Sequence, residues 1–438
     1  MIHTTIEALE NRIAPAVLGV ASIFVDASDL TVSLSAGTLK IAPKTAGVTS
    51  LDVTVELLPD GSLLISDSIG DSDLEDIANL TGNVRNIQAT LTAGDDRVKF
   101  LLDSDYTVAG NISVTTGAGT DEVELIDGAI RGNLTILGKG DNNVQISGGT
   151  VRGLLSNTSV GGTFKLAHGA SVGALTASGA TDFIVEGLVK GNATLSAKTG
   201  NASFQVGGVA NPAAAIGGNL TINAMDGADD IYLGNVLVRG AFAANLGGGD
   251  NDTFISADTS ILGVARITGR TGIDNVTLGT VGSVGPGIYG RLSLTLGDGA
   301  NSFLGHSGLI SGGLTYTGGA GVDTVDLGAG LTLFGDANIA VKNGANVVSV
   351  GSFSSLWKFT LAGGIDNDTV TLATVGAGYV NGSVNLGAGN DALTLSGVGD
   401  FFSTFKVDGG TGADTSTVSQ TVLDNGLVQT GIETITII

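Results

Sequence analysis

Short runs of alternating apolar and polar residues recur along most of this 438-residue chain. One kind of run follows a glycine, as in Gly218-Asn-Leu-Thr-Ile, and its period of two predicts a strand with one buried face. A second kind begins two residues after an Asp or Asn, as in Asp323-Thr-Val. A third, shorter kind leads into the next glycine, as in Val238-Arg-Gly. Each unit of the pattern therefore predicts three short strands.

The Asp or Asn position of this unit recurs at a nearly constant interval. Its 15 occurrences cover 318 residues in 14 intervals of 20 to 27 residues, a mean of about 22.7. A fixed period of this length is typical of solenoid proteins, and the absence of a helical pattern between the strands favours parallel strands stacked coil on coil. The occurrences are Asp96, Asp121, Asn142, Gly162, Asp182, Ala202, Asp229, Asp252, Asp274, Asn301, Asp323, Asn346, Asp368, Asp391 and Asp414.

The pattern predicts an all-β fold, a single-stranded parallel β-helix (β-solenoid) of about 15 three-stranded coils with a right-handed sense. At about 4.8 Å per level, 15 levels would form a rod about 70 Å long. Residues 1–80 fit the period poorly and are strand-rich, so we expect an N-terminal export and cap segment there. Residues 81–438 would form the repeat body, which ends in an open edge strand at Gly431-Ile-Glu-Thr-Ile-Thr-Ile-Ile. Open strand edges invite pairing, so we expect this edge to stack on another molecule.

The repeat unit also predicts tight corners. A glycine precedes the Asp or Asn position by two residues in 11 of the 15 units, and a corner that needs a positive φ would explain it. The second strand is expected to direct the residue two places after the Asp or Asn into the core, for example Ile184 and Phe254.

The charge balance narrows the choice of partners. The chain has 42 acidic and 19 basic residues, a formal charge of −23, which repels nucleic acid and anionic membrane surfaces. The apolar stretch Val17–Val25 is shorter than the roughly 20 residues that a membrane-spanning helix needs, so no membrane span is expected. The absence of cysteine excludes disulfides and thiolate metal sites.

One Asp or Asn per coil would place these side chains in a column. Carboxylates about 4.8 Å apart repel by roughly 3.5 kcal/mol at an effective dielectric of 20, so the column needs compensation. Asn substitution, hydrogen bonds from turn amides, raised pKa values or a bound hard cation could each supply it. We favour the interpretation that the side chains cap turn amides slightly over the interpretation that they bind ordered calcium.

Part of the unit resembles a known family. Gly318-Gly-Ala-Gly-Val-Asp-Thr-Val-Asp matches the RTX-type calcium-binding nonapeptide at every fixed position, and Gly409-Gly-Thr-Gly-Ala-Asp is a near match. The resemblance implies Ca²⁺ held between successive turns, although one copy per coil, rather than two in tandem, allows at most one column of ions. The candidate metal ligands are Asp229, Asp250, Asp252, Asp274, Asp323, Asp366, Asp368, Asp391 and Asp414.

A second resemblance lies near the start of the chain. Leu9-Glu-Asn-Arg-Ile-Ala-Pro-Ala is similar to a segment that opens many secreted or surface proteins of certain bacteria with β-strand repeats. It implies secretion or a place at the cell surface. Since Met1–Glu10 contains no Lys or Arg, we expect a non-classical export signal.

Catalytic patterns are weak in this sequence, and we expect no enzyme. Its three His residues have no partner pattern for a nucleophilic triad or a metal site. Repeated Gly-Asn starts predict a stacked Asn ladder rather than glycosylation sites. The expected function is a rigid acidic structural or surface protein that binds itself to form a fibre, layer or matrix. The alternatives are a protein that binds or degrades cell-surface polysaccharide and, in third place, an ice-binding protein. Ice binding uses a regular, outward-facing Thr-x-Thr array, and Thr-x-Thr occurs here only sporadically, as in Thr315-Tyr-Thr.

Overall fold

A computed structural model describes residues 22–23, 30–45, 47–57, 62–67, 75–80, 84–198, 200–208, 214–351, 355–375, 381–398 and 404–438. The chain divides into two compact units, Met1–Ala180 and Thr181–Ile438. Together they contribute about 14 turns of parallel β-solenoid, against the 15 expected, and about 60% of the residues lie in strands. The predicted all-β parallel β-helix is confirmed. The segment Leu9–Ala16, which carried the resemblance to surface proteins, lies outside the described residues.

Unit 1 contains the first 17 strands that the structure describes. They are β1(Ser22–Ile23), β2(Leu30–Ser35), β3(Thr38–Pro43), β4(Asp52–Leu57), β5(Leu63–Asp67), β6(Glu75–Leu80), β7(Asn86–Thr90), β8(Arg97–Leu101), β9(Thr107–Val108), β10(Ile112–Thr115), β11(Thr120–Ile126), β12(Ala129–Ile130), β13(Leu134–Leu137), β14(Asp141–Ile146), β15(Thr150–Thr158), β16(Thr163–Leu166) and β17(Ser171–Ser178).

Antiparallel hairpins precede the first parallel level of unit 1. β2 pairs with β3, and the connecting residues Ala36 and Gly37 both have positive φ, as a two-residue type I′ hairpin requires. β4 pairs antiparallel with β5, and β5 pairs antiparallel with β6. β3 and β4 then run parallel to β7 and β8, the first strands of the solenoid. The hairpins therefore lie against one end of the first coil.

Unit 2 contains the remaining strands and one short helix. They are β18(Asp182–Val185), β19(Leu188–Val189), β20(Ala193–Ser196), β21(Ser203–Gly207), β22(Ala214–Ile216), β23(Leu220–Asn223), β24(Asp230–Gly234), β25(Val236–Val238), β26(Phe242–Gly247), β27(Asn251–Ile255), β28(Ser260–Ile261), β29(Ala265–Gly269), β30(Asp274–Leu278), β31(Gly287–Ile288), β32(Leu292–Thr295), β33(Ser302–Ile310), β34(Leu314–Thr317), β35(Thr324–Ala340), β36(Val347–Val350), β37(Ser355–Gly364), β38(Thr369–Val375), β39(Asn381–Gly387), β40(Ala392–Val398), β41(Thr404–Asp408), β42(Thr415–Val418), α1(Gln420–Asp424), β43(Val428–Thr430) and β44(Thr434–Ile437).

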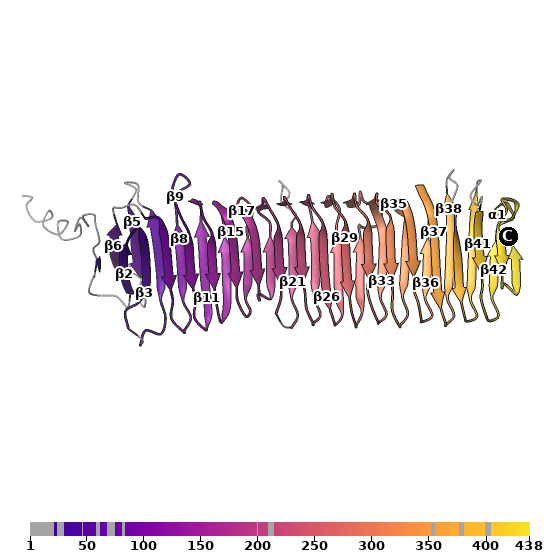
Figure 1. Ribbon diagram of the computed structural model, residues 1–438, viewed down its shortest axis with the longest axis horizontal. Coiled ribbons are helices and arrows are strands. Elements are labelled where there is room, and N and C mark those ends of the chain that lie inside the picture. Colours follow the sequence, from indigo (N-terminus) through magenta and orange to yellow (C-terminus); the bar gives the residue numbers. More distant parts are fainter. Residues whose placement is uncertain are drawn as a thin grey trace, which may run out of the picture. The chain divides into compact units, whose positions relative to one another are not determined.

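Three strands make one coil in the regular part of unit 2. β26, β27 and β28 form one coil, and each pairs in parallel with its counterpart in the next coil, β29, β30 and β31. Figure 1 shows these strands following one another level by level. In later coils two or three of the strands merge, because a bulge replaces the corner, as between Gly305 and Ser307. The merged strands of unit 2 are β33, β35 and β37.

Alternating side chains of these strands form the core. Val238, Ile261 and Ile288 face inward at the same position of successive coils, and none of them is exposed. Phe183 and Phe204 stack in the same way, with ring centroids 4.7 Å apart. Burial of such side chains is the main driving force for stacking one coil on another.

The predicted register is wrong by one residue in two coils. Phe183 rather than Ile184 is buried, because Phe183 pairs with Phe204. Thr253 rather than Phe254 is buried, because Thr253 pairs with Ile231 and Val276. Side chains alternate along a strand, so an offset of one residue exchanges the inner and outer faces. The Asp or Asn position moves with the register in both coils.

The corner glycines have two different physical reasons. Eight of the 11 have a positive φ, as expected, and these are Gly119, Gly200, Gly272, Gly299, Gly321, Gly344, Gly389 and Gly412. Gly94, Gly140 and Gly227 are not among the positive-φ residues. A Cβ at each of those three would collide with a backbone oxygen of the preceding level. Close approach of two backbones, not φ, requires glycine there.

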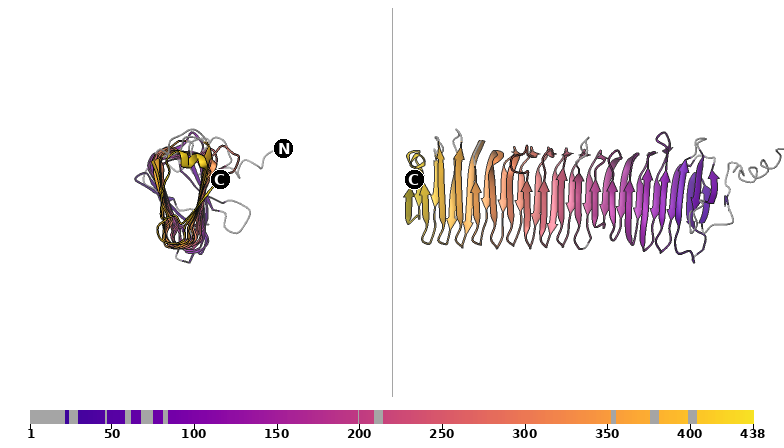
Figure 2. Two further views of the ribbon diagram at one scale, coloured as in Figure 1. Left: turned by 90° about the vertical axis from the view of Figure 1, so that its right-hand side faces the viewer. Right: turned by 180° about the vertical axis from the view of Figure 1, so that it is seen from behind.

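The last level of unit 2 consists of β43 and β44, and α1 packs on β40 near it. In Figure 2, α1 appears at one end of the cross-section of the coil. β43 pairs with β41 and β44 with β42, and within the described part of the chain their other edges carry no strand. No helix that the structure describes is long and apolar enough to cross a membrane.

Candidate functional site

A ladder of buried Asp and Asn side chains follows one corner of the coils. We call it the Asx ladder and define it by the residues that occupy this corner in successive coils. In unit 1 they are Asp96, Asp121, Asn142 and Gly162. In unit 2 they are Thr181, Ala202, Asp229, Asn251, Asp274, Asn301, Asp323, Asn346, Asp368, Asp391 and Asp414. All of the Asp and Asn members are at most 3% exposed.

Most ladder Asp and Asn side chains accept a hydrogen bond from a backbone N–H of the preceding coil, whereas Asp274 accepts from Asn251 Nδ2 at 2.7 Å and Asn142 accepts from Thr116 Oγ1 at 3.1 Å. The N–H of Asp323 donates to Asn346 Oδ1 at 2.9 Å, and the N–H of Asn346 donates to Asp368 Oδ1 at 3.0 Å. The N–H of Asp368 donates to Asp391 Oδ1 at 2.7 Å. The ladder ends where the N–H of Asp414 donates to the Glu433 carboxylate at 2.7 Å. These side chains accept hydrogen bonds from backbone amides, as an Asx-turn role also predicts, but the amides in these bonds belong to the preceding coil and not to the side chain's own turn.

Asp and Asn alternate in the central part of the Asx ladder, from Asn251 to Asp368. The carboxamide Nδ2 of each Asn donates to the carboxylate of the next level, for example Asn301 to Asp323 Oδ1 at 3.1 Å. Asn251 and Asn346 donate to Asp274 and Asp368 in the same way, at 2.7 and 2.9 Å. A carboxylate therefore faces a carboxamide, and like charges lie two levels apart. The sequence-based column missed this order because it took Asp252 for Asn251.

The residue five places before each ladder position alternates as well. From Asn251 to Asp368 it is glycine before the Asp residues and a large apolar residue before the Asn residues, namely Leu246, Leu296 and Val341 against Gly269, Gly318 and Gly363. A Cβ at any of these three glycines would collide with Oδ2 of the ladder Asp in its own turn. The first glycine of the RTX-like motif thus makes room for a buried carboxyl group.

Burial sets the ionisation of the ladder. It raises the pKa of Asp229, Asp274 and Asp323 from 3.8 to about 6, and the hydrogen bonds to their oxygens oppose this change only in part. Oδ2 of each of these three is buried without a hydrogen-bond partner. Burial also raises the pKa of Asp391, as do the neighbouring charges of Asp414 and Asp368.

The structure brings six of the nine predicted metal ligands together in the Asx ladder and places the other three outside it. Asp250, Asp252 and Asp366 are exposed, and their carboxylates accept bonds from Ile273 N–H at 2.8 Å, Asn275 Nδ2 at 2.9 Å and Gly344 N–H at 2.9 Å. Asp182 also lies outside the ladder, since Thr181 takes its position. Sequence reasoning took Asp182 and Asp252 for the corner residues, one residue after the true positions Thr181 and Asn251.

The Asx ladder does not fit a bound calcium ion. Ca²⁺ takes six to eight oxygen ligands. Each ladder carboxylate in unit 2 has Oδ1 engaged by an amide of the preceding level, and between adjacent levels an Asn often points its Nδ2 at the carboxylate. Among the described residues no group of three His, Cys, Asp or Glu side chains is placed to hold a metal ion. The arrangement is that of a structural hydrogen-bond ladder.

Tyr316 is a member of this region that sequence reasoning missed. It was read only as the middle of Thr315-Tyr-Thr, a fragment of an outward Thr array. Its side chain is fully buried in the core, between Leu294 and Ile339 of the adjacent levels. Burial, together with the charges of Asp323 and Asp274, raises the pKa of the Tyr316 hydroxyl. The alternation of inward and outward positions was the signal that could have found it.

A second ladder lies at the corner before the first strand. In unit 1 the N–H of Asn111 donates to Asn86 Oδ1 at 2.9 Å, and the N–H of Asn133 donates to Asn111 Oδ1 at 2.8 Å. In unit 2 the N–H of Asn219 donates to Asn192 Oδ1 at 2.8 Å. The Asn ladder expected from the Gly-Asn repeats is confirmed.

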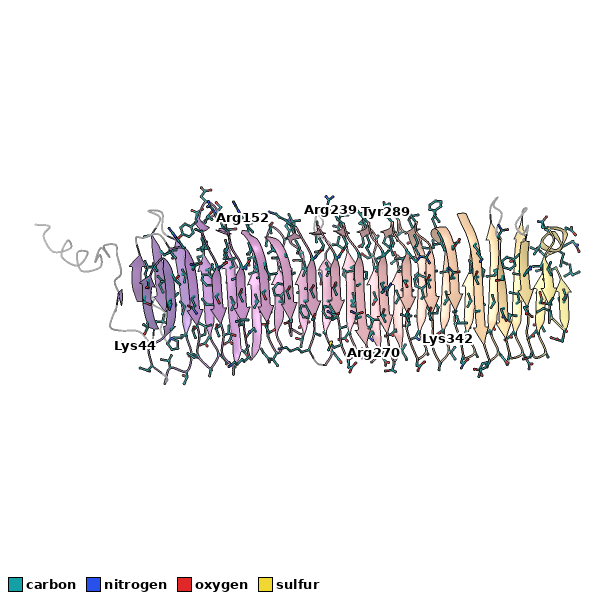
Figure 3. All side chains as sticks on the ribbon, viewed as in Figure 1. Lys44, Arg152, Arg239, Arg270, Tyr289 and Lys342 are labelled. Atoms are coloured by element: carbon teal, nitrogen blue, oxygen red, sulfur yellow. The ribbon has the colours of Figure 1, made fainter. Side chains whose placement is uncertain are left out.

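Some basic residues of unit 2 lie at either edge of the coils, whereas Arg266 and Lys406 lie within strands β29 and β41. In Figure 3, Arg239 and Tyr289 lie at one edge, and Arg270 and Lys342 lie at the opposite edge.

Comparison with protein-family models finds no family that matches this chain, and no curated protein is significantly similar to it.

Proposed function

We propose that this chain is a non-enzymatic structural or surface protein, located outside the cell, whose acidic β-solenoid coils assemble with further copies into a fibre, layer or matrix. Both units consist of regularly stacked β-coils, a construction typical of rod-like proteins. The excess of acidic residues and the β-strand repeats support an extracellular place. Calcium dependence is not part of the proposal, because the Asx ladder does not fit the ion.

The uncovered last level of unit 2 carries this proposal. Ile435 and Ile437 pair with Ser416 and Val418, which are buried in the core. Their side chains therefore point toward the core, yet they are 48% and 55% exposed because no further described level covers them.

A second copy of this chain is the partner that best matches this surface. The free edges of β43 and β44 present backbone N–H and C=O groups that another strand edge can satisfy. Contact between two such edges would also cover the side chains of Ile435 and Ile437. The formal charge of −23 opposes association at low ionic strength, so added salt should promote it.

Light scattering coupled to size-exclusion chromatography, over rising protein and salt concentrations, tests the proposal. The unaltered chain should associate, and the double variant Ile435→Lys, Ile437→Lys should stay monomeric. Val281→Lys is the matched control, because Val281 is 81% exposed on a turn far from β44 in sequence, and it should associate normally. A strict monomer at every concentration, or unchanged association of the double variant, would overturn the proposal.

A further inference from the structure

Unit 2 has a hollow on its outer surface where one side chain of a regular column is missing. In the third strand of successive coils the outward positions pair as Leu237, Ser260, Gly287 and Leu309. The inward neighbours continue the core without interruption. Because Gly287 has no side chain, a depression opens between Ser260 and Leu309.

An unusually long turn deepens this depression. The coil from Asp274 to Asn301 spans 27 residues, the longest spacing in the described coils of unit 2 along with that before Asp229. Its extra residues form a turn held by a 2.6 Å hydrogen bond between the hydroxyls of Thr280 and Ser283. Ser307 Oγ of the next coil donates to Thr280 O at 3.0 Å and fastens the turn to the solenoid.

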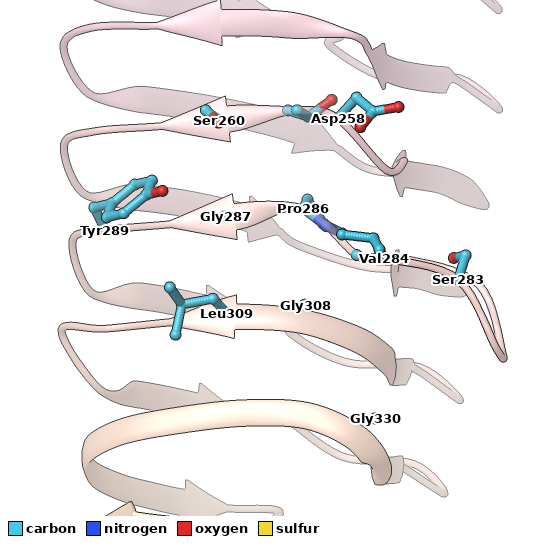
Figure 4. Close-up of a pocket in the computed structure, with 12 residues that line it drawn as sticks. Asp258, Ser260, Ser283, Val284, Pro286, Gly287, Tyr289, Gly308, Leu309 and Gly330 are labelled. Atoms are coloured by element: carbon cyan, nitrogen blue, oxygen red, sulfur yellow. The ribbon is translucent and has the colours of Figure 1, made fainter.

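The result is a cavity of 420 Å³, within the range of about 300–1,000 Å³ typical of small-molecule sites. Figure 4 shows Tyr289 at one end of the cavity and Asp258, Ser283 and Val284 at the other. A Cβ on Gly287 would lie 3.0 Å from Tyr289 Cε2, so the aromatic ring lies alongside the floor of the hollow. Tyr289 is 52% exposed and Val284 83% exposed.

The lining alternates apolar and hydrogen-bonding groups. Tyr289, Leu309 and Val284 offer apolar surface, while Ser260, Ser283 and Asp258 offer hydroxyl and carboxylate groups. No Lys or Arg is among the lining residues, and the net charge of the chain is strongly negative, so an anionic ligand is disfavoured. A sugar ring has the complementary surface, with apolar C–H faces that pack on an aromatic ring and hydroxyls around its rim.

We propose that this hollow binds one segment of a neutral polysaccharide, with a pyranose ring against Tyr289 and sugar hydroxyls bonded to Asp258 and Ser260. The hollow binds the sugar and does not cleave it, because glycoside hydrolysis in most families uses a pair of carboxyl groups, and Asp258 is the one carboxylate of the lining. Bound polysaccharide would attach the solenoid to a glycan surface.

Titration of the full chain with three soluble neutral oligosaccharides, cellohexaose, maltohexaose and chitohexaose, tests the inference. We expect one of them to bind in the millimolar range or tighter, measured by saturation-transfer NMR and calorimetry. Loss of the stacking ring in Tyr289→Ala should weaken binding about tenfold or more, whereas Tyr289→Phe should keep most of the affinity. Asp258→Asn should weaken binding without changing the melting temperature.

Phe334→Ala is the matched control. Ile288, Ile310 and Leu333 pair at the same position of three successive coils. Tyr289 and Phe334 each follow one of these residues, so Phe334 occupies the column of Tyr289 two levels away. Phe334 does not line the hollow. This variant should bind the oligosaccharide with unchanged affinity. Absence of binding by all three oligosaccharides, or binding that Tyr289→Ala leaves unchanged, would overturn the inference.

Discussion

Asp391 interrupts the alternation of the Asx ladder, and its replacement by Asn should stabilise the protein. It is preceded at five residues by Leu386, the kind of residue that elsewhere accompanies Asn, yet it carries a carboxyl group between Asp368 and Asp414. Its Oδ2 is buried and has no hydrogen-bond partner. In Asp391→Asn, the Nδ2 group of the new carboxamide would occupy the place of that oxygen. It could then donate to Asp414 Oδ1 and to a turn carbonyl, as Nδ2 of Asn346 donates to Asp368 Oδ1 and to Lys342 O.

The size of the effect follows from these contacts. One unsatisfied buried oxygen costs about 1–3 kcal/mol, and a hydrogen bond to a charged group contributes about 1.5–3 kcal/mol. Repulsion from an ionised neighbour about 4.8 Å away adds up to roughly 3.5 kcal/mol at an effective dielectric of 20. Since Asp368 and Asp391 are themselves shifted toward the protonated form, we expect a net gain of about 2 kcal/mol near neutral pH.

The gain should depend on pH with a defined sign. The pKa of Asp391 is raised above 3.8 in the folded protein, so the folded chain binds the proton more tightly than the unfolded chain does. Its contribution to stability is therefore complete below about pH 3.8 and falls as pH rises through the raised pKa. The Asn variant has no such loss, so its advantage should be small in acid and grow toward neutral pH.

Hydrogen exchange measured by mass spectrometry is the appropriate assay, because unfolding of a long repeat array need not be two-state. A gain of 2 kcal/mol would slow exchange in peptides from residues 381–398 by about thirtyfold near neutral pH. Asn346→Asp is the mirror control and should speed exchange around residue 346, since it places a carboxyl group between Asp323 and Asp368. Faster exchange in Asp391→Asn, or no effect of either variant, would refute the idea that alternation stabilises the ladder.

Three further predictions concern the same ladder. Lowering the pH from about 7.5 to about 5 should raise the melting temperature, because Asp229, Asp274 and Asp323, with pKa values of about 6, bind protons more tightly in the folded state. A lower melting temperature at about pH 5 would contradict this prediction. Gly318→Ala should destabilise its coil by about 1–3 kcal/mol, measured by hydrogen exchange, because its Cβ would meet Asp323 Oδ2. Gly208→Ala meets only flexible side chains and should cost less. Addition of millimolar Ca²⁺ to EDTA-treated protein should leave the melting curve unchanged, and a clear upward shift would show that the ladder or another site holds the ion.

The sequence was sufficient to predict the coil, because the period, the three apolar runs and the corner glycines act locally and repeat many times. The register at Asp182 and Asp252 was not predictable in the same way. Each has a polar neighbour one residue earlier. Asn251 satisfies the motif equally well, and Thr181 takes the ladder position although it is neither Asp nor Asn. The choice depends on which side chain pairs with the core of the next coil. Pairing between coils is a long-range property that one unit does not contain.

The candidate site shows the same limit. The glycine-aspartate motif indicated a turn correctly, but its resemblance to a calcium motif could not reveal what faces each carboxylate. That depends on the residue one coil away, for instance Asn301 against Asp323. Tyr316 was missed for a related reason, because the threonines on both sides of it suggested a strand face exposed to solvent. The hollow at Gly287 results from a missing side chain, which a search for chemical groups does not detect.

The pairing of Asn with a preceding apolar residue and of Asp with a preceding glycine gives this part of unit 2 a repeat of two coils rather than one. Adding or removing a single coil between Asn251 and Asp368 would place two carboxyl groups, or two carboxamides, side by side. Adding or removing two coils would leave every neighbour unchanged. The length of this part of the solenoid can therefore vary with every ladder neighbour kept only in steps of about 45 residues, the interval from Asn301 to Asn346 and from Asp323 to Asp368.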